Sequence, residues 1–482
     1  MDPGFADAYP LRMRFIALFI ALVGALLAGG SLSARQATPA IDLSKIDGIF
    51  SRWTTATPGC AVGASVNGKL VVNKAYGMAD LEHDVPNTAE TIFEAGSVSK
   101  QFTAAGVLLL AREGKLSLDD PVRKYVPELP DYGSPILIRH MLTHMSGLRD
   151  WGSVMAIAGW PRTSRVYTHA HVLDIVSRQS MPNFPAGTQY SYSNTGYNLA
   201  AIIIARVTGK PFAEFEQERL FKPLGMTHTS WRDDFTRVVK GRAIAYEARP
   251  DGFHQDMPFE NIHGNGGLLT TVGDLLKWNQ HFTTPGIIGD TSFVKAQETV
   301  GIFNNNQPGT YAMGLVVGTY RGVKQIDHSG STAGYRAHLA RYPDQGLSVA
   351  VLCNVSTGAA TQYAHDVVDA VIPSALGPAP ARPAPAPATP AAPAAPRDFA
   401  AYPGTYVSDD AETTLIAAIE GNGLVLKRRP DTVIRLTPAG ANPDVFTSSL
   451  GQISFRRDAP NGEIIGLSVR QDRVWNLLFE RR

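Results

Sequence analysis

Two β-rich runs and one helical run open the folded part of the chain. The runs CAVGASV and KLVVNKAYG flank Asn67-Gly68, and both residues of that dipeptide tolerate the positive φ of a two-residue hairpin turn. From Val98 apolar residues recur at helical spacing until Gly114, which supplies a C-terminal stop. The pattern predicts a hairpin and then a helix whose N-terminus lies at or beside Ser97.

Beyond this helix the pattern changes twice. Residues 118–282 have the pattern of short helices and loops without long alternating runs, which predicts a helical insert. Alternation returns in 311–330 and 335–354, and helical spacing in 359–371. Because strands lie at both ends and no strand–helix–strand alternation occurs, we expect an α+β fold. Helices would flank one antiparallel sheet, which strands from both ends of the domain close.

The C-terminal part has two further patterns. Residues 378–397 are nearly all Pro and Ala, which favours an extended linker. Residues 398–482 alternate in short runs such as LVLKR, QISFR and VWNLLF, which predicts a small antiparallel β-barrel. We therefore divide the chain into an N-terminal extension (1–37), an α+β domain (38–377), the linker and the barrel domain (398–482).

The N-terminal extension has the pattern of a signal peptide. Arg12 and Arg14 precede the apolar run 15–28, which is shorter than the ~20 residues of a membrane-spanning helix, and mostly small residues follow. Met13 could itself be the start, and the interpretation is the same in that case. We expect export to the periplasm or the medium, with no membrane span after cleavage.

Charge and cysteine content narrow the classes of partner. The 482 residues include 44 Lys and Arg against 43 Asp and Glu, and no basic run occurs, which argues against nucleic acid and anionic lipid. We expect a small ligand that is not polyanionic. Cys60 and Cys353 lie in strand-like runs and are the only cysteines. Two buried free thiols are the expected state, and a disulfide is the alternative.

The predicted helix start carries a Ser-x-x-Lys motif, Ser97 with Lys100. The motif alone is weak evidence, because it occurs again at Ser292 and Lys295. On a helix, however, Lys100 lies one turn beyond Ser97 on the same face, where its amine can approach the hydroxyl. A serine becomes a nucleophile when a base takes its proton, and a lysine is such a base only when its pKa is lowered. The pair therefore needs a third group.

The polar loop Tyr192-Ser193-Asn194 is one candidate for that group. A Tyr192 phenolate could share the proton held by Lys100 and Ser97 and then protonate a leaving group, while the Asn194 amide holds a substrate carbonyl. Taken alone, the motif fits a helix-capping loop better.

His328-Ser329-Gly330 ends a strand-like run and is the second candidate. On an edge strand Gly330 would let a substrate approach the backbone, and the Ser331 N–H could join the Ser97 N–H in an oxyanion hole. Taken alone, His328 fits a structural histidine better.

With these motifs in order on a helix start, a loop and a strand, the sequence resembles the serine β-lactamase and penicillin-binding-protein superfamily. The similarity covers 41–373, including LIRHMLTHMSGL and GNGGLLTTVGDLLKW, in the branch of class C β-lactamases, D-Ala-D-Ala carboxypeptidases, D-aminopeptidases and esterases. The resemblance implies a serine hydrolase of β-lactamase/transpeptidase-like fold without metal or cofactor. In it Ser97 is acylated, Lys100 and Tyr192 transfer protons, Asn194 binds substrate and His328 belongs to the strand motif. The tail resembles lipocalin-like domains of some of these enzymes and could cover the cleft.

The strand motif departs from the family pattern. β-Lactamases and most transpeptidases have Lys-Thr-Gly or Lys-Ser-Gly at this strand, and neither occurs in the chain. Because a histidine near neutrality supplies little positive charge, we expect His328 to bind a substrate carboxylate less well than lysine would. The expected substrates are small carboxylic esters, D-amino-acid amides or peptides, with cell-wall fragments among them. A β-lactamase or D-Ala-D-Ala carboxypeptidase is the alternative.

Further candidates for the cleft are Arg149 and Asp150, after HMSGL, and the glycine turn 264–267, although each also fits surface or turn structure. The chain has no Gly-x-Ser-x-Gly and no His-Glu-x-x-His, which argues against an α/β-hydrolase and a zinc protease. A non-catalytic cell-wall-binding or sensor protein remains as a rival class.

Overall fold

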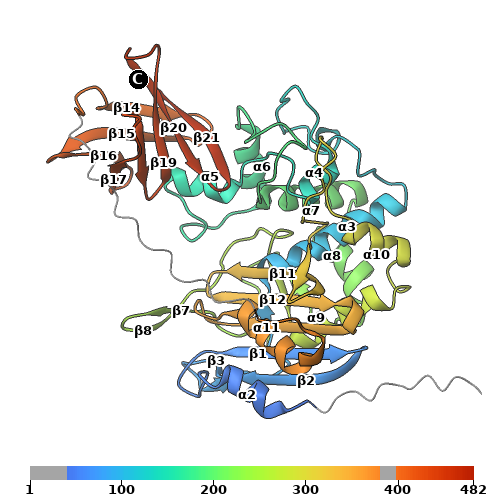
Figure 1. Cartoon of the computed structure of the whole chain (residues 1–482). Helices are drawn as coiled ribbons and strands as arrows, with labels where there is room; N and C mark the ends of the chain where they lie inside the picture. The colour runs from blue at the N-terminus through green and yellow to red at the C-terminus, as the bar shows by residue number, and fades with distance from the viewer. Residues whose placement is uncertain (1–40, 380–397) are drawn as a thin grey trace, which may run out of the picture. The chain divides into compact units, whose positions relative to one another are not determined.

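The computed structural model describes residues 41–379 and 398–482, which fall in one compact unit (Figure 1). The predicted signal segment and all but the first two residues of the predicted linker lie outside the described residues. Within the described ranges, no helix combines the length and the apolar character that crossing a bilayer requires.

Six antiparallel strands form the central sheet in the order β10-β11-β12-β13-β1-β2. Strands from the two ends of the domain meet where β1 pairs with β13. This confirms the predicted closure and the α+β fold class. The strands are β1 (Cys60–Val66), β2 (Lys69–Tyr76), β10 (Val316–Tyr320), β11 (Val323–Thr332), β12 (Tyr335–Tyr342) and β13 (Leu347–Cys353).

Two tight turns join strands of the central sheet, and the first is the predicted hairpin turn at Asn67-Gly68. Asn67 and Gly68, between β1 and β2, have φ of 49° and 75°. Arg321 and Gly322, between β10 and β11, have φ of 46° and 86°. Two successive positive φ values match the twist of the flanking strands in a tight hairpin. These turns align the strands, so that β11 carries the His328 motif toward its C-terminal end.

Helices cover both faces of the sheet (Figure 1). On one face α2 (Leu43–Phe50) packs against α11 (Ala360–Val371), and on the other α9 (Val272–Thr283) packs against β1 and β13. The helix α3 (Lys100–Arg112) is buried along nearly its whole length and packs against α7 (Asn194–Thr208). The central position of α3 keeps its first turn rigid.

The segment between α3 and β10 is mainly helical, as predicted, but it also contributes short strands to two small sheets, β5-β9-β6 and β7-β8. The strand β9 is fully buried between β5 and β6. The remaining helices are α4 (Ile138–Leu142), α5 (Trp151–Ala158), α6 (His169–Ser177), α8 (Phe212–Glu216) and α10 (Thr291–Glu298). The short turns of helix are η1 (Gly96–Ser99), η2 (Val122–Lys124), η3 (Gln217–Phe221), η4 (Pro343–Gln345) and η5 (Pro373–Ala375). The short strands are β3 (Met78–Asp80), β4 (Val85–Pro86), β5 (Phe93–Glu94), β6 (Ser230–Trp231), β7 (Tyr246–Arg249), β8 (Gly252–Gln255) and β9 (Leu268–Thr270).

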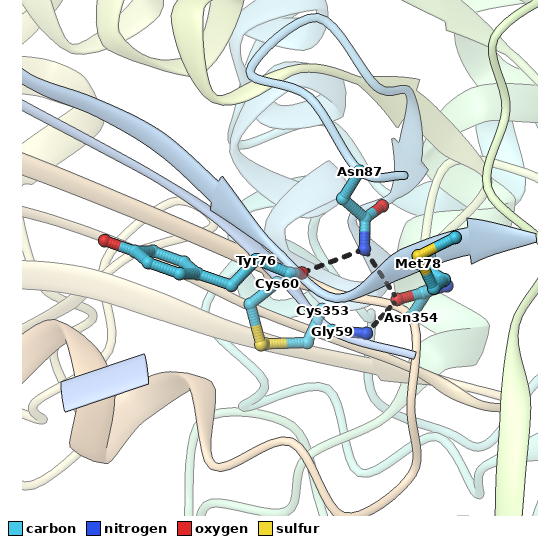
Figure 2. Close-up of a disulfide and its surroundings, with 7 residues drawn as sticks. All are labelled: Gly59, Cys60, Tyr76, Met78, Asn87, Cys353 and Asn354. Atoms are coloured by element: carbon cyan, nitrogen blue, oxygen red, sulfur yellow. Dashed lines mark hydrogen bonds between the residues drawn. A yellow bond between two sulfur atoms is a disulfide. The ribbon is translucent and has the colours of Figure 1, made fainter. Parts of the chain in front are cut away.

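The two cysteines are joined, so the expectation of free thiols is wrong. Cys60 and Cys353 form a disulfide between β1 and β13 (Figure 2). The hydrophobic pattern of two strands does not reveal their register, and here the register places the cysteines directly opposite, with Cα atoms 4.0 Å apart. Beside the bridge, the Asn354 side chain accepts from the Gly59 N–H at 2.8 Å and donates to the Met78 carbonyl at 3.0 Å (Figure 2).

Eight antiparallel strands form a closed barrel in chain order, which confirms the predicted C-terminal fold. Pairing of β14 with β21 closes it. Alternate residues such as Leu415, Leu426 and Leu467 point into its core and are fully buried. The strands are β14 (Gly404–Ser408), β15 (Thr413–Glu420), β16 (Gly423–Arg428), β17 (Thr432–Pro438), β18 (Val445–Ser448), β19 (Gly451–Arg457), β20 (Ile464–Gln471) and β21 (Val474–Arg481).

Candidate active site

Ser97 and Lys100 lie at the start of the central helix. Ser97 is in the short turn η1 and Lys100 begins α3, so one helical turn separates them. The Lys100 Nζ is 3.0 Å from the Ser97 Oγ, and Lys100 is completely buried. In the second Ser-x-x-Lys motif, the Ser292 hydroxyl instead donates to the Asp290 carboxylate at 2.6 Å on an exposed helix start. The structure therefore distinguishes the two occurrences.

Burial determines the protonation state of Lys100. Removal from water lowers the pKa of Lys100 well below its usual value, and the positive charge of Arg473 lowers it further. The Lys100 Nζ also lies 2.9 Å from the Asn194 Oδ1 and 2.7 Å from the Asn265 carbonyl oxygen, and both oxygens can only accept. A neutral amine has two N–H groups and one lone pair. When both N–H groups point to these oxygens, the lone pair faces the Ser97 hydroxyl.

Tyr192 lies against this pair as a neutral phenol. Its ring centroid is 4.8 Å from the Lys100 Nζ, and Tyr192 and Ser97 both line the same cavity. Burial raises the pKa of Tyr192 well above its usual value, and the nearby Ser97 side chain only partly opposes this shift. Burial therefore favours the neutral phenol over the phenolate considered from the sequence, because a dry site penalises the charged form. A phenol in this place can still accept one proton while it gives up another.

Asp150 positions Asn194 from behind and does not line the cleft, in contrast to its predicted role as a substrate-binding residue. The Asn194 N–H, at the start of α7, donates to the Asp150 Oδ2 at 2.8 Å. The Asp150 Oδ1 accepts from the Ser153 N–H at 3.0 Å and so caps α5. Many aspartates cap a helix as Asp150 does, so its place in the sequence could not reveal that it also binds the Asn194 N–H.

Arg149 is also turned away from the cleft, and its predicted contact with substrate is corrected accordingly. Its buried guanidinium donates to the Asp410 carboxylate at 2.6 Å and to the Asn476 carbonyl at 3.0 Å. A buried arginine requires a carboxylate partner, and here the barrel supplies it. Arg149 and Asp410 lie far apart in the sequence, so no local motif predicts that they pair.

Two glycines bring the turn of Ser97 against strand β11. A Cβ atom on Gly330 would lie 2.0 Å from the Ala95 carbonyl oxygen and 3.2 Å from the Ser97 nitrogen. Gly96 has φ of 51°, and a Cβ atom there would lie 2.6 Å from the Ser331 nitrogen. Only glycine allows so close an approach of two backbones. The main-chain amides of Ser97 and Ser331 therefore lie at one seam, as a two-amide oxyanion hole requires.

His328 is a neutral histidine whose ring nitrogens are both engaged. The Tyr311 hydroxyl is 2.8 Å from the His328 Nε2, and the His328 Nδ1 is 2.6 Å from the Ser329 carbonyl oxygen. Because a carbonyl only accepts, Nδ1 carries the proton and Nε2 accepts from the tyrosine. Burial lowers the pKa of His328 to about 3. The residue therefore brings no positive charge to the strand.

These groups open into one cavity of about 680 Å³. The structure brings together at its wall the predicted residues Ser97, Tyr192, Asn194, His328, Gly330 and Ser331. The glycine turn 264–267 contributes behind the wall, through the Asn265 carbonyl that holds Lys100. Sequence reasoning missed three arginines of the wall, Arg162, Arg336 and Arg473. They come from three distant segments without a motif, so no local signal could have found them.

One grouping of possible metal ligands occurs among residues 41–379 and 398–482, formed by Asp80, Glu82 and His83. It lies on a turn where the His83 Nδ1 is 2.8 Å from the Asp80 carboxylate. None of these three residues lines the Ser97 cavity.

Comparison with known proteins agrees with this geometry. The Beta-lactamase family model matches residues 42–371. A D-aminopeptidase of Gluconobacter oxydans (strain 621H) is 29% identical over 321 residues, which are 66% of this chain and 59% of that protein. The octameric penicillin-binding protein homologue from Pyrococcus abyssi has a TM-score of 0.62 at 23% identity and covers 91% of this chain and 100% of its own. The D-amino acid amidase from Ochrobactrum anthropi SV3 has a TM-score of 0.58 at 24% identity, over 69% of this chain and 97% of its own.

The fold and the site define a class: α+β proteins with a serine and a buried lysine at the start of a central helix. The family model extends over well more than half of the chain. The chain belongs to the beta-lactamase family of class C-like serine hydrolases. The structural likenesses, all below 25% identity, show the fold alone. This chain spans about three fifths of the length of the D-aminopeptidases that it matches.

Proposed function

We propose that the protein is an exported serine hydrolase that cleaves carboxylic esters and amides through a Ser97 acyl-enzyme, with D-amino-acid derivatives as its preferred substrates. The observation that carries the proposal is the Lys100 amine. Both of its N–H groups have obligate acceptors, and its lone pair is left for the Ser97 hydroxyl. A buried lysine in this state is a general base at neutral pH.

The first half of the reaction forms the acyl-enzyme. Lys100 takes the Ser97 proton as the Oγ attacks the substrate carbonyl carbon, and the amides of Ser97 and Ser331 stabilise the developing oxyanion. The proton then passes from the Lys100 ammonium through the Tyr192 phenol to the leaving amine or alkoxide. The carbon–heteroatom bond breaks, and the acyl group stays on Ser97.

The second half reverses the proton path. Water loses a proton to the Tyr192–Lys100 pair as its oxygen attacks the acyl carbon, and the proton returns to the Ser97 Oγ when the acid leaves. His328 does not take part in proton transfer in this scheme, because both of its nitrogens are hydrogen-bonded. It positions the end of β11, where Gly330 and Ser331 meet the substrate.

Two observations support D-amino-acid derivatives over other substrates. The relatives include a D-aminopeptidase and the solved structures a D-amino acid amidase. In addition, no lysine stands in the strand motif that β-lactamases and most transpeptidases have, which argues against efficient β-lactam hydrolysis. The signal-like pattern of residues 15–28 supports export, and the proposed substrates are accordingly ones found outside the cytoplasm.

A substrate panel tests the proposal. We would compare kcat/KM for the p-nitroanilides of D-alanine and L-alanine, free and Nα-acetylated, with 4-nitrophenyl butyrate and nitrocefin. We expect a preference for D over L of about tenfold or more, since the pocket must discriminate by shape and hydrogen bonding. We also expect nitrocefin to be the poorest substrate. Preference for the L-enantiomer, or nitrocefin as the best substrate, would contradict the assignment.

A further inference from the structure

The wall of the Ser97 cavity is positively charged. Arg162, Arg336 and Arg473 contribute to it, and none of the described residues that line it is an aspartate or a glutamate. Arginine stays charged at every working pH, so this charge is permanent. A cavity with this lining attracts an anionic group.

The three arginines differ in the groups that they already contact. Arg162 forms a two-bonded ion pair with the Glu260 carboxylate, and its charge is thereby balanced. The Arg336 Nη1 donates to the carbonyls of Ala333 and Tyr335, both at 2.7 Å, which orients it along β12. Among the described residues, neither Arg336 nor Arg473 forms an ion pair with a carboxylate. Of these two, Arg473 is the one that lies against the Tyr192 ring, beside the reacting groups.

Arg473 reaches the site from the turn between β20 and β21 of the barrel. Its guanidinium carbon is 4.7 Å from the centroid of the Tyr192 ring. Hydrogen bonds to the Arg473 carbonyl anchor the turn. This carbonyl accepts from the Asp150 N–H at 3.2 Å and from the side-chain amide of Asn183 at 3.1 Å. The Trp475 N–H in turn donates to the Asn183 Oδ1 at 2.7 Å. These bonds hold the arginine beside the reacting groups.

We propose that Arg473 is the carboxylate-binding residue of this hydrolase, so that the barrel completes the active site and selects substrates with an anionic group near the scissile bond. The proposal rests on the Ser97 mechanism. The guanidinium offers a planar fork that can bind a carboxylate through two hydrogen bonds.

Matched ester pairs test the role of Arg473. Mono-4-nitrophenyl glutarate against 4-nitrophenyl pentanoate places the carboxylate on the acyl side, and 5-acetoxy-2-nitrobenzoate against 4-nitrophenyl acetate places it on the leaving group. The measured quantity is the ratio of kcat/KM for the anionic ester to that for its neutral partner. The charge of Arg473 also lowers the pKa of Lys100, so a substitution of Arg473 changes that pKa. This change affects both esters of a pair alike and therefore cancels in the ratio.

We expect one pair to favour the anionic ester in the wild type, and Arg473→Gln to lower that ratio by about ten- to a hundredfold. Arg473→Lys should restore part of it. The control Arg470→Gln removes an arginine from the same hairpin, where its guanidinium carbon stacks 4.5 Å from the Trp475 ring centroid, and should leave the ratio unchanged.

Three outcomes would overturn the proposal. They are a wild type that favours neither anionic ester, a ratio that Arg473→Gln leaves unchanged, and an equal loss of the ratio in Arg470→Gln. Ser97→Ala separates this failure from failure of the proposed function. If Ser97→Ala abolishes hydrolysis of the neutral esters but Arg473→Gln leaves the ratio unchanged, the hydrolase mechanism is supported and the anion site is refuted.

Discussion

At the scale of single residues, the structure assigns different tasks to groups that look alike in sequence. Lys100 and Lys295 both follow a serine by three positions, but Lys100 is completely buried with three oxygens around its amine. Burial shifts a lysine toward its neutral form, which is the form that can accept a proton. The catalytic assignment therefore depends on environment and not on spacing.

Removal of either proton-transfer residue should slow acylation strongly. We expect Lys100→Ala and Tyr192→Phe each to reduce the rate of acyl-enzyme formation by about 10²- to 10⁴-fold, as loss of a general acid–base partner does. The measurement is pre-steady-state release of 4-nitrophenol from 4-nitrophenyl butyrate. Lys295→Ala is the matched control and should react at the wild-type rate. Near-normal acylation in both site variants would show that another base operates.

The pH profile should report Lys100 and not His328. Because the pKa of Lys100 is lowered, its amine is neutral above that pKa, and kcat/KM should fall as the pH drops through it. The pKa of His328 is about 3, so this histidine stays neutral from pH 5 to 8. We expect His328→Gln to leave the midpoint of the acidic limb in place. Disappearance of that limb in His328→Gln would identify the histidine as the titrating base.

The sequence revealed the side chains with a motif and missed those without one. Ser97, Lys100, Tyr192 and Asn194 could be named because their motifs follow one another in the order of a known family of serine hydrolases. The Asn265 carbonyl could not be named, because a backbone acceptor carries no residue signature. Arg473 could not be named either, since only the fold of a separate barrel brings it to the cavity.

At the scale of secondary-structure elements, hydrophobic alternation predicted the sheet and the barrel but not the register of the strands. The dipeptide Asn67-Gly68 is enough to predict its turn, because both residues tolerate a positive φ. The pairing of β1 with β13 joins segments far apart in the chain, and no local pattern predicts its register. That unknown register is the reason that the Cys60–Cys353 disulfide was not expected. For the same reason, the sequence could not predict the close backbone approach of Gly96 and Gly330.

The disulfide should stabilise the domain measurably. It closes a loop between residues 293 positions apart, and both cysteines are fully buried. We expect the double variant Cys60→Ala/Cys353→Ala to lower the free energy of unfolding by about 2–4 kcal/mol, since a long loop is released in the unfolded chain. Urea unfolding followed by circular dichroism measures this difference. Adding a reductant should not change the variant, and equal stability of variant and oxidised wild type would refute a stabilising bridge.

At the scale of the whole molecule, the barrel and the α+β domain are joined by hydrogen bonds and by an ion pair between buried polar groups. Arg149 binds Asp410 of the barrel, and the Arg473 turn binds Asp150 and Asn183. Sequence pattern predicted both folds, because each has its own periodicity. It could not predict these contacts, which depend on how two separately patterned segments fit together.

The central claim is that Ser97 is the nucleophile, and covalent labelling tests it most directly. The protein would be treated with a fluorophosphonate probe, and the modified peptide identified by mass spectrometry in the wild type, Ser97→Ala and Ser292→Ala. We expect one label on Ser97 in the wild type and in Ser292→Ala, and none in Ser97→Ala. Undiminished labelling of Ser97→Ala, or a label on Ser292, would contradict it.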